Sequence, residues 1–296
     1  MHKIPELEET LFSFLHYILR VLVATGIQLL VLLGPLLLLA LLMELITRQI
    51  GKLGPEVFGY RTYVYGFKWL GTPVHELGHA LFALLFLHKI TDIKLFDPKA
   101  SGGMYGYVNH RYHPGNIYQE IGRFFIGIGP ILLGSLVLFL SCFFLFRVRL
   151  QDLHGAAFSL TTVTQMESLK GFATGMMQGI LRFVQLVFGG ENTAWWKILI
   201  LGYLLFSVGS SLTLSPPDIK DALAGFLYFV ALLLIFNLVT LWIGNFATTF
   251  LTTVSAFFSG FYLLMILSIL VNGIFVLLLA MLAPLLKPLK RKVRGA

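Results

Sequence analysis

A run of 65 residues without a formal charge, residues 222–286, most constrains what this chain can fold into. As one α-helix the run would be about 98 Å long, roughly three times the ~30 Å hydrocarbon core of a bilayer. It must therefore fold back at least once, and the sequence predicts breaks at Gly244-Asn245 and Ser259-Gly260. We expect two membrane-spanning helices here, at about residues 218–243 and 262–286.

The composition extends this interpretation to the whole chain. Charged residues are only 12% of the sequence, about half of the ~25% typical of soluble domains, and hydrophobic residues are 57%. Four other apolar stretches are long enough to cross a membrane, at about residues 21–45, 70–90, 122–146 and 195–214. The sequence therefore predicts an all-α polytopic membrane protein, with about six transmembrane helices in a single integral membrane domain over residues 1–296.

The charge distribution predicts an orientation in the membrane. The net charge is +8, and the C-terminal tail carries five cations, Lys287, Lys290, Arg291, Lys292 and Arg294. Basic segments beside membrane spans remain in the cytoplasm, so we expect a cytoplasmic C-terminus. Six spans put the N-terminus on the same side, and a seventh span within residues 245–262 would reverse it. We expect no nucleic-acid partner, because no basic patch interleaved with aromatic residues occurs on a soluble domain.

The most informative motif is His75-Glu76-Leu77-Gly78-His79, at the head of the second apolar stretch. Residues four apart lie on one face of a helix, so His75 and His79 can direct a ring nitrogen at one metal ion. Glu76 lies about 100° further round the helix, where it can take a proton from a metal-bound water. The single cysteine, Cys142, lies in an apolar run, so we expect one Zn²⁺ per chain, bound by histidines and a carboxylate.

The position of this motif in an apolar segment favours a functional site. A glutamate and two histidines are costly in lipid, and such residues mark sites of function by default. The structural alternative is a pair of histidines hydrogen-bonded inside a helix bundle, with Glu76 paired to a nearby basic group. That alternative is disfavoured because it leaves an acid at membrane depth without a purpose.

A third metal ligand is expected from an acid elsewhere in the chain. Asp218 follows two prolines between two apolar runs, which places a carboxylate at a helix start at membrane depth. Asp218 also stands three residues after Ser215, so it can act as the acid of a capping box, and the two roles are compatible. Asp218 is the favoured ligand, and Asp221 and Glu44 are the alternatives.

The segment between the second and third spans, residues 90–119, is polar and contains several turn signals. Leu95-Phe96 and residues 104–108 can pair as a short β-hairpin, which predicts a hairpin-like or re-entrant loop after the motif helix. Its strand edge could hold an extended substrate, and an ordinary surface loop is the alternative. His110 and His113 have no supporting carboxylate pattern and are interpreted as loop histidines.

Three other segments have local patterns of interest. Residues 51–70 are rich in aromatic side chains, which predicts an interfacial belt, a shallow re-entrant segment or ordinary core aromatics. Residues 169–187 form an amphipathic helix that lies in the interface or packs on other helices. In the third span, Gly129-Pro130 is expected to free backbone carbonyls and to let helices approach closely.

Three motifs, in this order, resemble the site-2 protease family of intramembrane zinc metalloproteases. They are HELGH at residues 75–79, Gly129-Pro130 in a later span, and Ser215-Pro216-Pro217-Asp218 at the start of another. The resemblance covers residues 70–227, and its central part is similar to a bacterial metallopeptidase branch of the family. The chain departs from the family pattern at Leu133, where asparagine is usual, and around Asp218, where Leu-Asp-Gly is usual.

The resemblance implies a fold, a reaction and a location. It implies a zinc ion held by His75, His79 and Asp218, with Glu76 transferring the proton during hydrolysis of a peptide bond. Gly129-Pro130 would help to position the substrate, a transmembrane protein or peptide that is locally unwound in the lipid bilayer. The bacterial branch implies the inner membrane.

Two other classes of protein could carry the same residues. A membrane transporter or sensor would bind a metal without hydrolysis, and a membrane scaffold would use neither metal nor catalysis. Glu76 argues against both classes, because it is dispensable for binding a metal and is needed for proton transfer.

Overall fold

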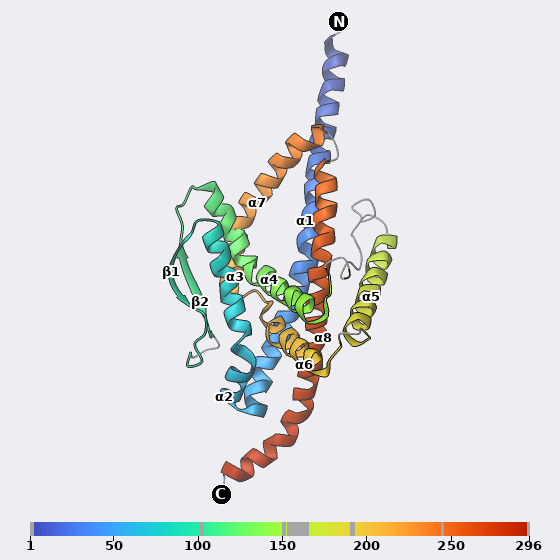
Figure 1. Ribbon diagram of the computed structural model, residues 1–296. Helices are drawn as coiled ribbons and strands as arrows, with labels where there is room; N and C mark the ends of the chain where they lie inside the picture. The colour runs from blue at the N-terminus through green and yellow to red at the C-terminus, as the bar shows by residue number, and fades with distance from the viewer. Residues whose placement is uncertain are drawn as a thin grey trace.

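The protein is mainly helical, with one small two-stranded sheet at its side (Figure 1). A computed structural model describes residues 3–100, 104–149, 152, 166–189, 193–243 and 246–294. Its main elements are α1 (Lys3–Phe58), α2 (Tyr60–Tyr63), the π-helix η1 (Val64–Lys68), α3 (Gly71–Leu85), β1 (Lys89–Lys94), β2 (Tyr107–Arg111), α4 (Ile117–Phe146), α5 (Met166–Phe188), α6 (Trp195–Ser207), the 3₁₀-helix η3 (Gly209–Ser211), α7 (Pro216–Ile243) and α8 (Phe246–Arg294).

Within the described ranges, four helices are long and apolar enough to cross a membrane, namely α1, α4, α7 and α8. Much of their apolar surface faces outward. On α7, for example, Leu227, Trp242 and Ile243 are 72%, 85% and 82% exposed. Such a surface is unfavourable in water and suits a lipid environment. The predicted class, an all-α membrane protein, is therefore confirmed.

The predicted count of six spans is not confirmed, because α3 and α6 are short. With 15 and 13 residues they measure about 22 and 20 Å, less than the ~30 Å hydrocarbon core. α3 ends at Leu85, and the chain turns through Leu87, whose φ is 59°, into strand β1. α6 ends at Ser207 and passes into η3, ahead of the prolines that open α7.

The long charge-free run folds back between α7 and α8. α7 ends at Ile243 and α8 begins at Phe246, and the break predicted at Gly244-Asn245 lies outside the described residues. The second predicted break, at Ser259-Gly260, is wrong. Both of these residues are buried inside α8, where their small size suits helix packing better than a turn.

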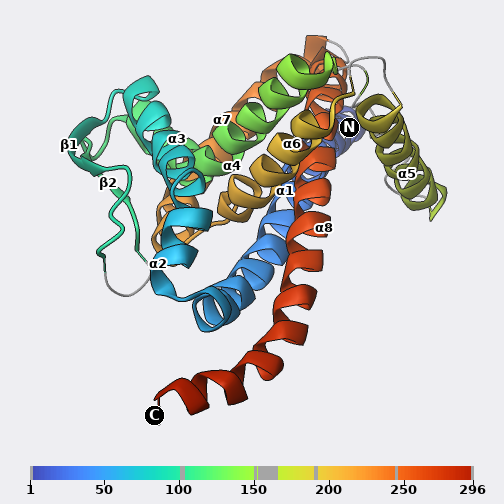
Figure 2. The ribbon, with the colours of Figure 1, turned by 60° about the horizontal axis from the view of Figure 1, so that its bottom comes forward.

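The centre of the molecule is formed by α1 and α8, which run side by side (Figures 1 and 2). The Tyr262 hydroxyl of α8 donates a hydrogen bond of 2.7 Å to the Leu32 carbonyl of α1. Phe183 and Val187 of α5 are buried in the same core cluster, together with Leu264 of α8. The amphipathic helix thus packs on other helices, which was one of its two predicted arrangements.

A polar cluster joins α1 to α7 at a distance along α7 from Asp218. The amides of Gln28 and Asn237 exchange hydrogen bonds of 2.6 and 3.1 Å, and Asn237 also donates to the Thr25 hydroxyl at 2.8 Å. Asn237 is completely buried. Polar side chains that satisfy one another between helices stabilise their association in lipid, so this cluster fixes α7 against the first span.

The aromatic segment at residues 51–70 is helical and contains both buried and exposed rings. Tyr63 is 3% exposed, and the Phe67 ring lies 5.1 Å from Phe206 and 5.4 Å from Phe275. The exposed rings of the segment are those of Phe58, Tyr60, Tyr65 and Trp69. The segment therefore contributes core aromatics and leads directly into α3.

A β-hairpin is present in the segment where one was predicted, although its strands differ from the predicted ones, and it lies beside α3 (Figure 1). Strands β1 and β2 pair in antiparallel register from Lys89 opposite Arg111 to Lys94 opposite Tyr107, with a bulge after Ile90. The strands are not the predicted ones, because Leu95-Phe96 follows the end of β1 and only Tyr107 and Val108 of residues 104–108 belong to β2. The β-branched residues among 90–93 favour extended backbone, which places the first strand ahead of Leu95-Phe96. The second strand includes His110, so the interpretation of this residue as a loop histidine is wrong.

Candidate metal centre

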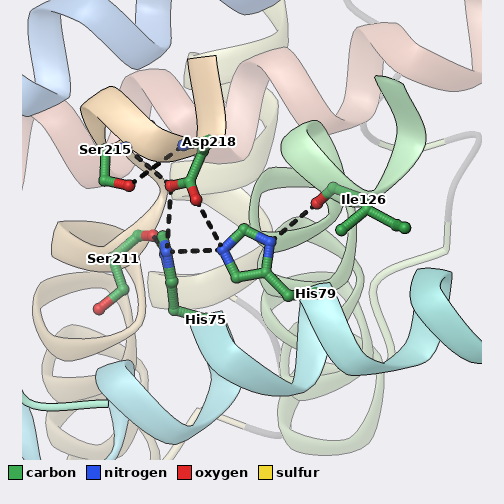
Figure 3. A network of polar contacts seen from close by, with 6 residues as sticks. All are labelled: His75, His79, Ile126, Ser211, Ser215 and Asp218. Atoms are coloured by element: carbon green, nitrogen blue, oxygen red, sulfur yellow. Dashed lines mark hydrogen bonds and ion pairs between the residues drawn. The ribbon is translucent and has the colours of Figure 1, made fainter. Parts of the chain in front are cut away.

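Three side chains from two helices point toward one another (Figure 3). His75 and His79 extend from the first turns of α3, and Asp218 extends from the first turn of α7. Nε2 of His79 lies 3.3 Å from Nε2 of His75 and 3.2 Å from Oδ1 of Asp218. Nε2 of His75 lies 3.7 Å from Oδ2 of Asp218. The three predicted ligands are thus brought together.

The spacing of these atoms fits a tetrahedral zinc site. Zinc bonds of about 2.0–2.2 Å to nitrogen and oxygen place neighbouring ligand atoms roughly 3.4 Å apart, and the three observed separations of 3.2, 3.3 and 3.7 Å lie around that value. Two neutral imidazoles and one carboxylate are also a donor set that zinc accepts. Three protein ligands leave a fourth tetrahedral position free.

The second ring nitrogen of each histidine fixes its orientation. Nδ1 of His75 lies 2.8 Å from the Ser211 carbonyl, and Nδ1 of His79 lies 2.8 Å from the Ile126 carbonyl. A carbonyl oxygen only accepts, so each Nδ1 carries the proton and donates it. In the neutral rings both Nε2 atoms then present lone pairs to the same point as the carboxylate. Such second hydrogen bonds are typical of histidines that bind metals.

Pro130 accounts for the carbonyl that orients His79. In an α-helix the Ile126 carbonyl would accept from the backbone N–H four residues later, and that residue is Pro130, which has none. The carbonyl is left free, and Nδ1 of His79 occupies it. The carbonyl that Gly129-Pro130 was predicted to free is therefore that of Ile126, and it accepts a hydrogen bond from His79. The Ser211 carbonyl is available for a similar reason, because Ser211 ends the 3₁₀-helix η3.

Asp218 is held by the start of its own helix. The Ser215 N–H donates to Oδ2 of Asp218 at 2.8 Å, and the Asp218 N–H donates to the Ser215 hydroxyl at 3.4 Å. This reciprocal arrangement is the predicted capping box. It leaves Oδ1 facing His79, so one carboxylate caps α7 and faces the histidines at the same time.

Glycines allow the helices of the site to approach closely. A Cβ atom at Gly78 would lie 2.6 Å from the Pro130 backbone, and one at Gly127 would lie 2.6 Å from the Ala222 side chain. Both distances are shorter than a carbon–carbon contact allows. Gly78 thus brings α3 against α4, and Gly127 brings α4 against α7. Gly129 and Pro130 lie in the contact between α3 and α4. The α4 residues that line the cavity next to the site, described below, are Ile126 and Gly127.

The two alternative acids have other partners. Asp221 accepts a hydrogen bond of 3.2 Å from the Arg123 guanidinium, which also bonds Glu120 at 3.2 Å. Glu44 pairs with Arg48 at 2.7 Å, one turn later on α1. Among the described residues, a cluster of potential metal ligands is formed by His75, His79 and Asp218. The geometry therefore favours Asp218 over both alternatives as the third ligand.

Glu76 lies beside this cluster without a basic partner. It is only 7% exposed, and within the described part of the chain its carboxylate makes no hydrogen bond or ion pair. The pairing with a basic group that the structural alternative requires is therefore not seen. Gly106 lies against it, because a Cβ added there would be 2.7 Å from Cγ of Glu76. The hairpin thus covers the carboxylate.

A cavity of about 790 Å³ opens onto the site. Its lining includes the three predicted ligands and Glu76, the segment 104–110 that includes most of β2, and the basic residues Arg48 of α1 and Lys68 of η1. Burial lowers the pKa of Lys68 to about 8. The cavity is large enough for several residues of a peptide and gives water a path to the site.

Some residues around the site could not be found from the sequence. The Ser211 carbonyl belongs to the backbone of an irregular turn, and no side-chain pattern marks it. Arg123 and Asp221 are 98 residues apart and become partners only through the contact between α4 and α7. Pro130 carried a usable signal, because a proline inside an apolar helix always frees a carbonyl.

Comparison of the chain with family models, with curated proteins and with solved structures found no match. The assignment of a function therefore rests on the geometry of the site.

Proposed function

We propose that the protein is a zinc metalloprotease of the membrane, which hydrolyses peptide bonds in or near transmembrane segments of other proteins. One observation carries the proposal. Two oriented Nε2 lone pairs, of His75 and His79, converge with the Asp218 carboxylate. Three electron-rich atoms at such distances repel one another unless a proton or a metal ion lies between them, and the tetrahedral spacing of all three suits Zn²⁺, one ion per chain.

Glu76 would supply the proton transfer. A bound zinc ion acts as a Lewis acid that brings the pKa of a water molecule toward neutrality. The Glu76 carboxylate would take a proton from that water, and the remaining oxygen would bond to the carbon of a peptide carbonyl. The carbon–nitrogen bond then breaks, and Glu76 passes the proton to the departing amine. The absence of a basic partner among the described residues leaves Glu76 free for this exchange.

The segment before β2 and the strand itself give the cavity a place for an extended chain. Residues 104–110 line the cavity consecutively, and β2 pairs with β1 along one side. A peptide in extended conformation can bond to the other edge of such a strand. A transmembrane substrate would therefore bind as a locally unwound segment, because a continuous helix has no free backbone groups.

The location of the protein is part of the proposal. The four apolar helices require a lipid bilayer as their environment. The bacterial inner membrane is proposed from the resemblance of the motifs, and a cytoplasmic C-terminus from the basic sequence of the tail.

The test is cleavage of a panel of single-span membrane proteins, co-reconstituted with the wild type or with Glu76→Gln. Gln has nearly the same shape but cannot accept the proton, so the variant should keep its zinc and lose turnover by about 10²–10⁴-fold. Equal cleavage by both proteins would refute the mechanism. A wild type that binds zinc and cleaves none of the panel, while zinc alters its transport or its partner binding, would favour a transporter or sensor.

A further inference from the structure

A second pair of histidines lies on the hairpin side of the cavity. Nδ1 of His110, on β2, lies 3.0 Å from Nδ1 of His88, which follows the end of α3. His88 is 3% exposed, and its Nε2 lies 2.9 Å from the Gln119 carbonyl. The proposed mechanism uses neither of these histidines, and His110 lines the same cavity as the metal site.

The hydrogen bonds of this pair fix both tautomers. The Gln119 carbonyl only accepts, so Nε2 of His88 carries a proton, and Nδ1 of neutral His88 is an acceptor. The atom that donates to it must be Nδ1–H of His110. In a neutral ring with its proton on Nδ1, Nε2 carries a lone pair. The fixed Gln119 backbone thus determines which nitrogen of His110 can accept a hydrogen bond.

Nε2 of His110 is available to a ligand. Within the described residues it has no hydrogen-bond partner, and Nδ1, on the other side of the ring, is occupied by His88. Burial, and next the neighbouring His88, lower the pKa of His110 and so favour the neutral ring that the hydrogen bonds also require. The cavity therefore presents a hydrogen-bond acceptor at His110, on the strand whose edge faces the proposed substrate.

We infer that Nε2 of His110 accepts a hydrogen bond from a peptide N–H of the substrate and thereby positions the extended chain at the metal centre. This inference rests on the proposed function. A hydrogen-bond acceptor such as Nε2 needs a donor from the substrate, and a backbone N–H is the donor that every residue except proline offers. His110 would touch the substrate directly, while His88 would only hold its ring.

Two substitutions distinguish this role from a structural one. In His110→Asn the side-chain amide can replace Nδ1–H and keep the bond to His88, but nothing replaces Nε2. In His110→Gln the longer side chain can place its carbonyl oxygen near the position of Nε2 and cannot replace Nδ1–H at the same time. His113→Asn and His113→Gln are matched controls, because His113 is exposed in the turn after β2.

The assay measures cleavage of fluorescently labelled casein by detergent-solubilised protein, with zinc content measured in parallel. Casein is chosen because an unfolded chain needs no unwinding step. We expect His110→Asn to raise KM about 3- to 10-fold at unchanged kcat, which corresponds to the loss of one neutral hydrogen bond. His110→Gln and both His113 variants should keep KM near the wild-type value.

If His110→Gln raised KM and His110→Asn left it unchanged, His110 would only hold the hairpin through its bond to His88, and the inference would be overturned. Equal KM values for all variants would overturn it as well. Failure of the zinc-loaded wild type to cleave either casein or the membrane panel would instead refute the proposed function itself.

Discussion

Substitution of Gly78 by Ala tests whether the contact between α3 and α4 controls the metal centre. The added Cβ would lie 2.6 Å from the Cα and N atoms of Pro130 and 2.8 Å from the carbonyl carbon of Gly129. All three are backbone atoms and cannot rotate away. An ordinary contact of 3.4 Å requires the two helices to separate by about 0.8 Å.

The separation should have two measurable consequences. Overpacking of this kind costs about 1–3 kcal/mol, partly offset by the roughly 1 kcal/mol by which Ala favours a helix over Gly. A shift of about 0.8 Å would also lengthen the 2.8 Å bond from His79 to the Ile126 carbonyl to about 3.6 Å, beyond hydrogen-bonding distance. Losing an orienting bond of this kind weakens metal binding about 10- to 100-fold.

The matched control is Gly202→Ala in α6, where an added Cβ meets nothing within 4 Å. Thermal unfolding in detergent should show Gly78→Ala less stable than this control by about 1–3 kcal/mol. Competition with a zinc chelator should show weaker binding in Gly78→Ala alone. If the two variants match in stability and in zinc affinity, the close helix contact does not control the site.

Three further substitutions test separate parts of the structure. Asp218→Ala should weaken zinc binding by more than about tenfold in a chelator competition, and Asp221→Ala should leave it nearly unchanged; the reverse result would move the third ligand to Asp221. Pro130→Ala restores an N–H that competes for the Ile126 carbonyl, so zinc affinity should fall about tenfold, and an unchanged affinity would mean that this carbonyl has no role. Asn237→Leu should lower stability by about 0.6–2 kcal/mol, while Thr240→Val should not, because the half-buried Thr240 bonds only to a carbonyl of its own helix, and equal effects of the two would remove the interhelical cluster as a cause.

The local features of the site follow from the sequence because they depend on short spacings. Two histidines four residues apart share a helix face in any α-helix, and Ser215 with Asp218 forms a capping box wherever a helix starts between them. The hairpin could also be predicted, because turn residues and β-branched residues lie close together along the chain. The positions of its strands could not be predicted, because β1 ends at Lys94, ahead of Leu95-Phe96, and β2 extends to Arg111, beyond the predicted residues 104–108.

The number and lengths of the spans could not be predicted in the same way. Hydropathy does not distinguish a short buried helix from a membrane span, so residues 70–90 and 195–214 were both assigned a full crossing. In the structure α3 ends at Leu85, where the chain turns into β1, and α6 ends at Ser207. Contacts that depend on helix packing, such as the bond between Arg123 and Asp221, likewise have no signal in the local sequence.

The central claim is that His75, His79 and Asp218 hold one zinc ion. Elemental analysis combined with X-ray absorption spectroscopy of the purified protein tests it most directly. The account predicts one zinc per chain, bound by two imidazole nitrogens and at least one oxygen at about 2.0–2.2 Å, and lost in His75→Ala and His79→Ala. Protein without stoichiometric metal, or zinc that remains fully bound in both variants, would contradict it.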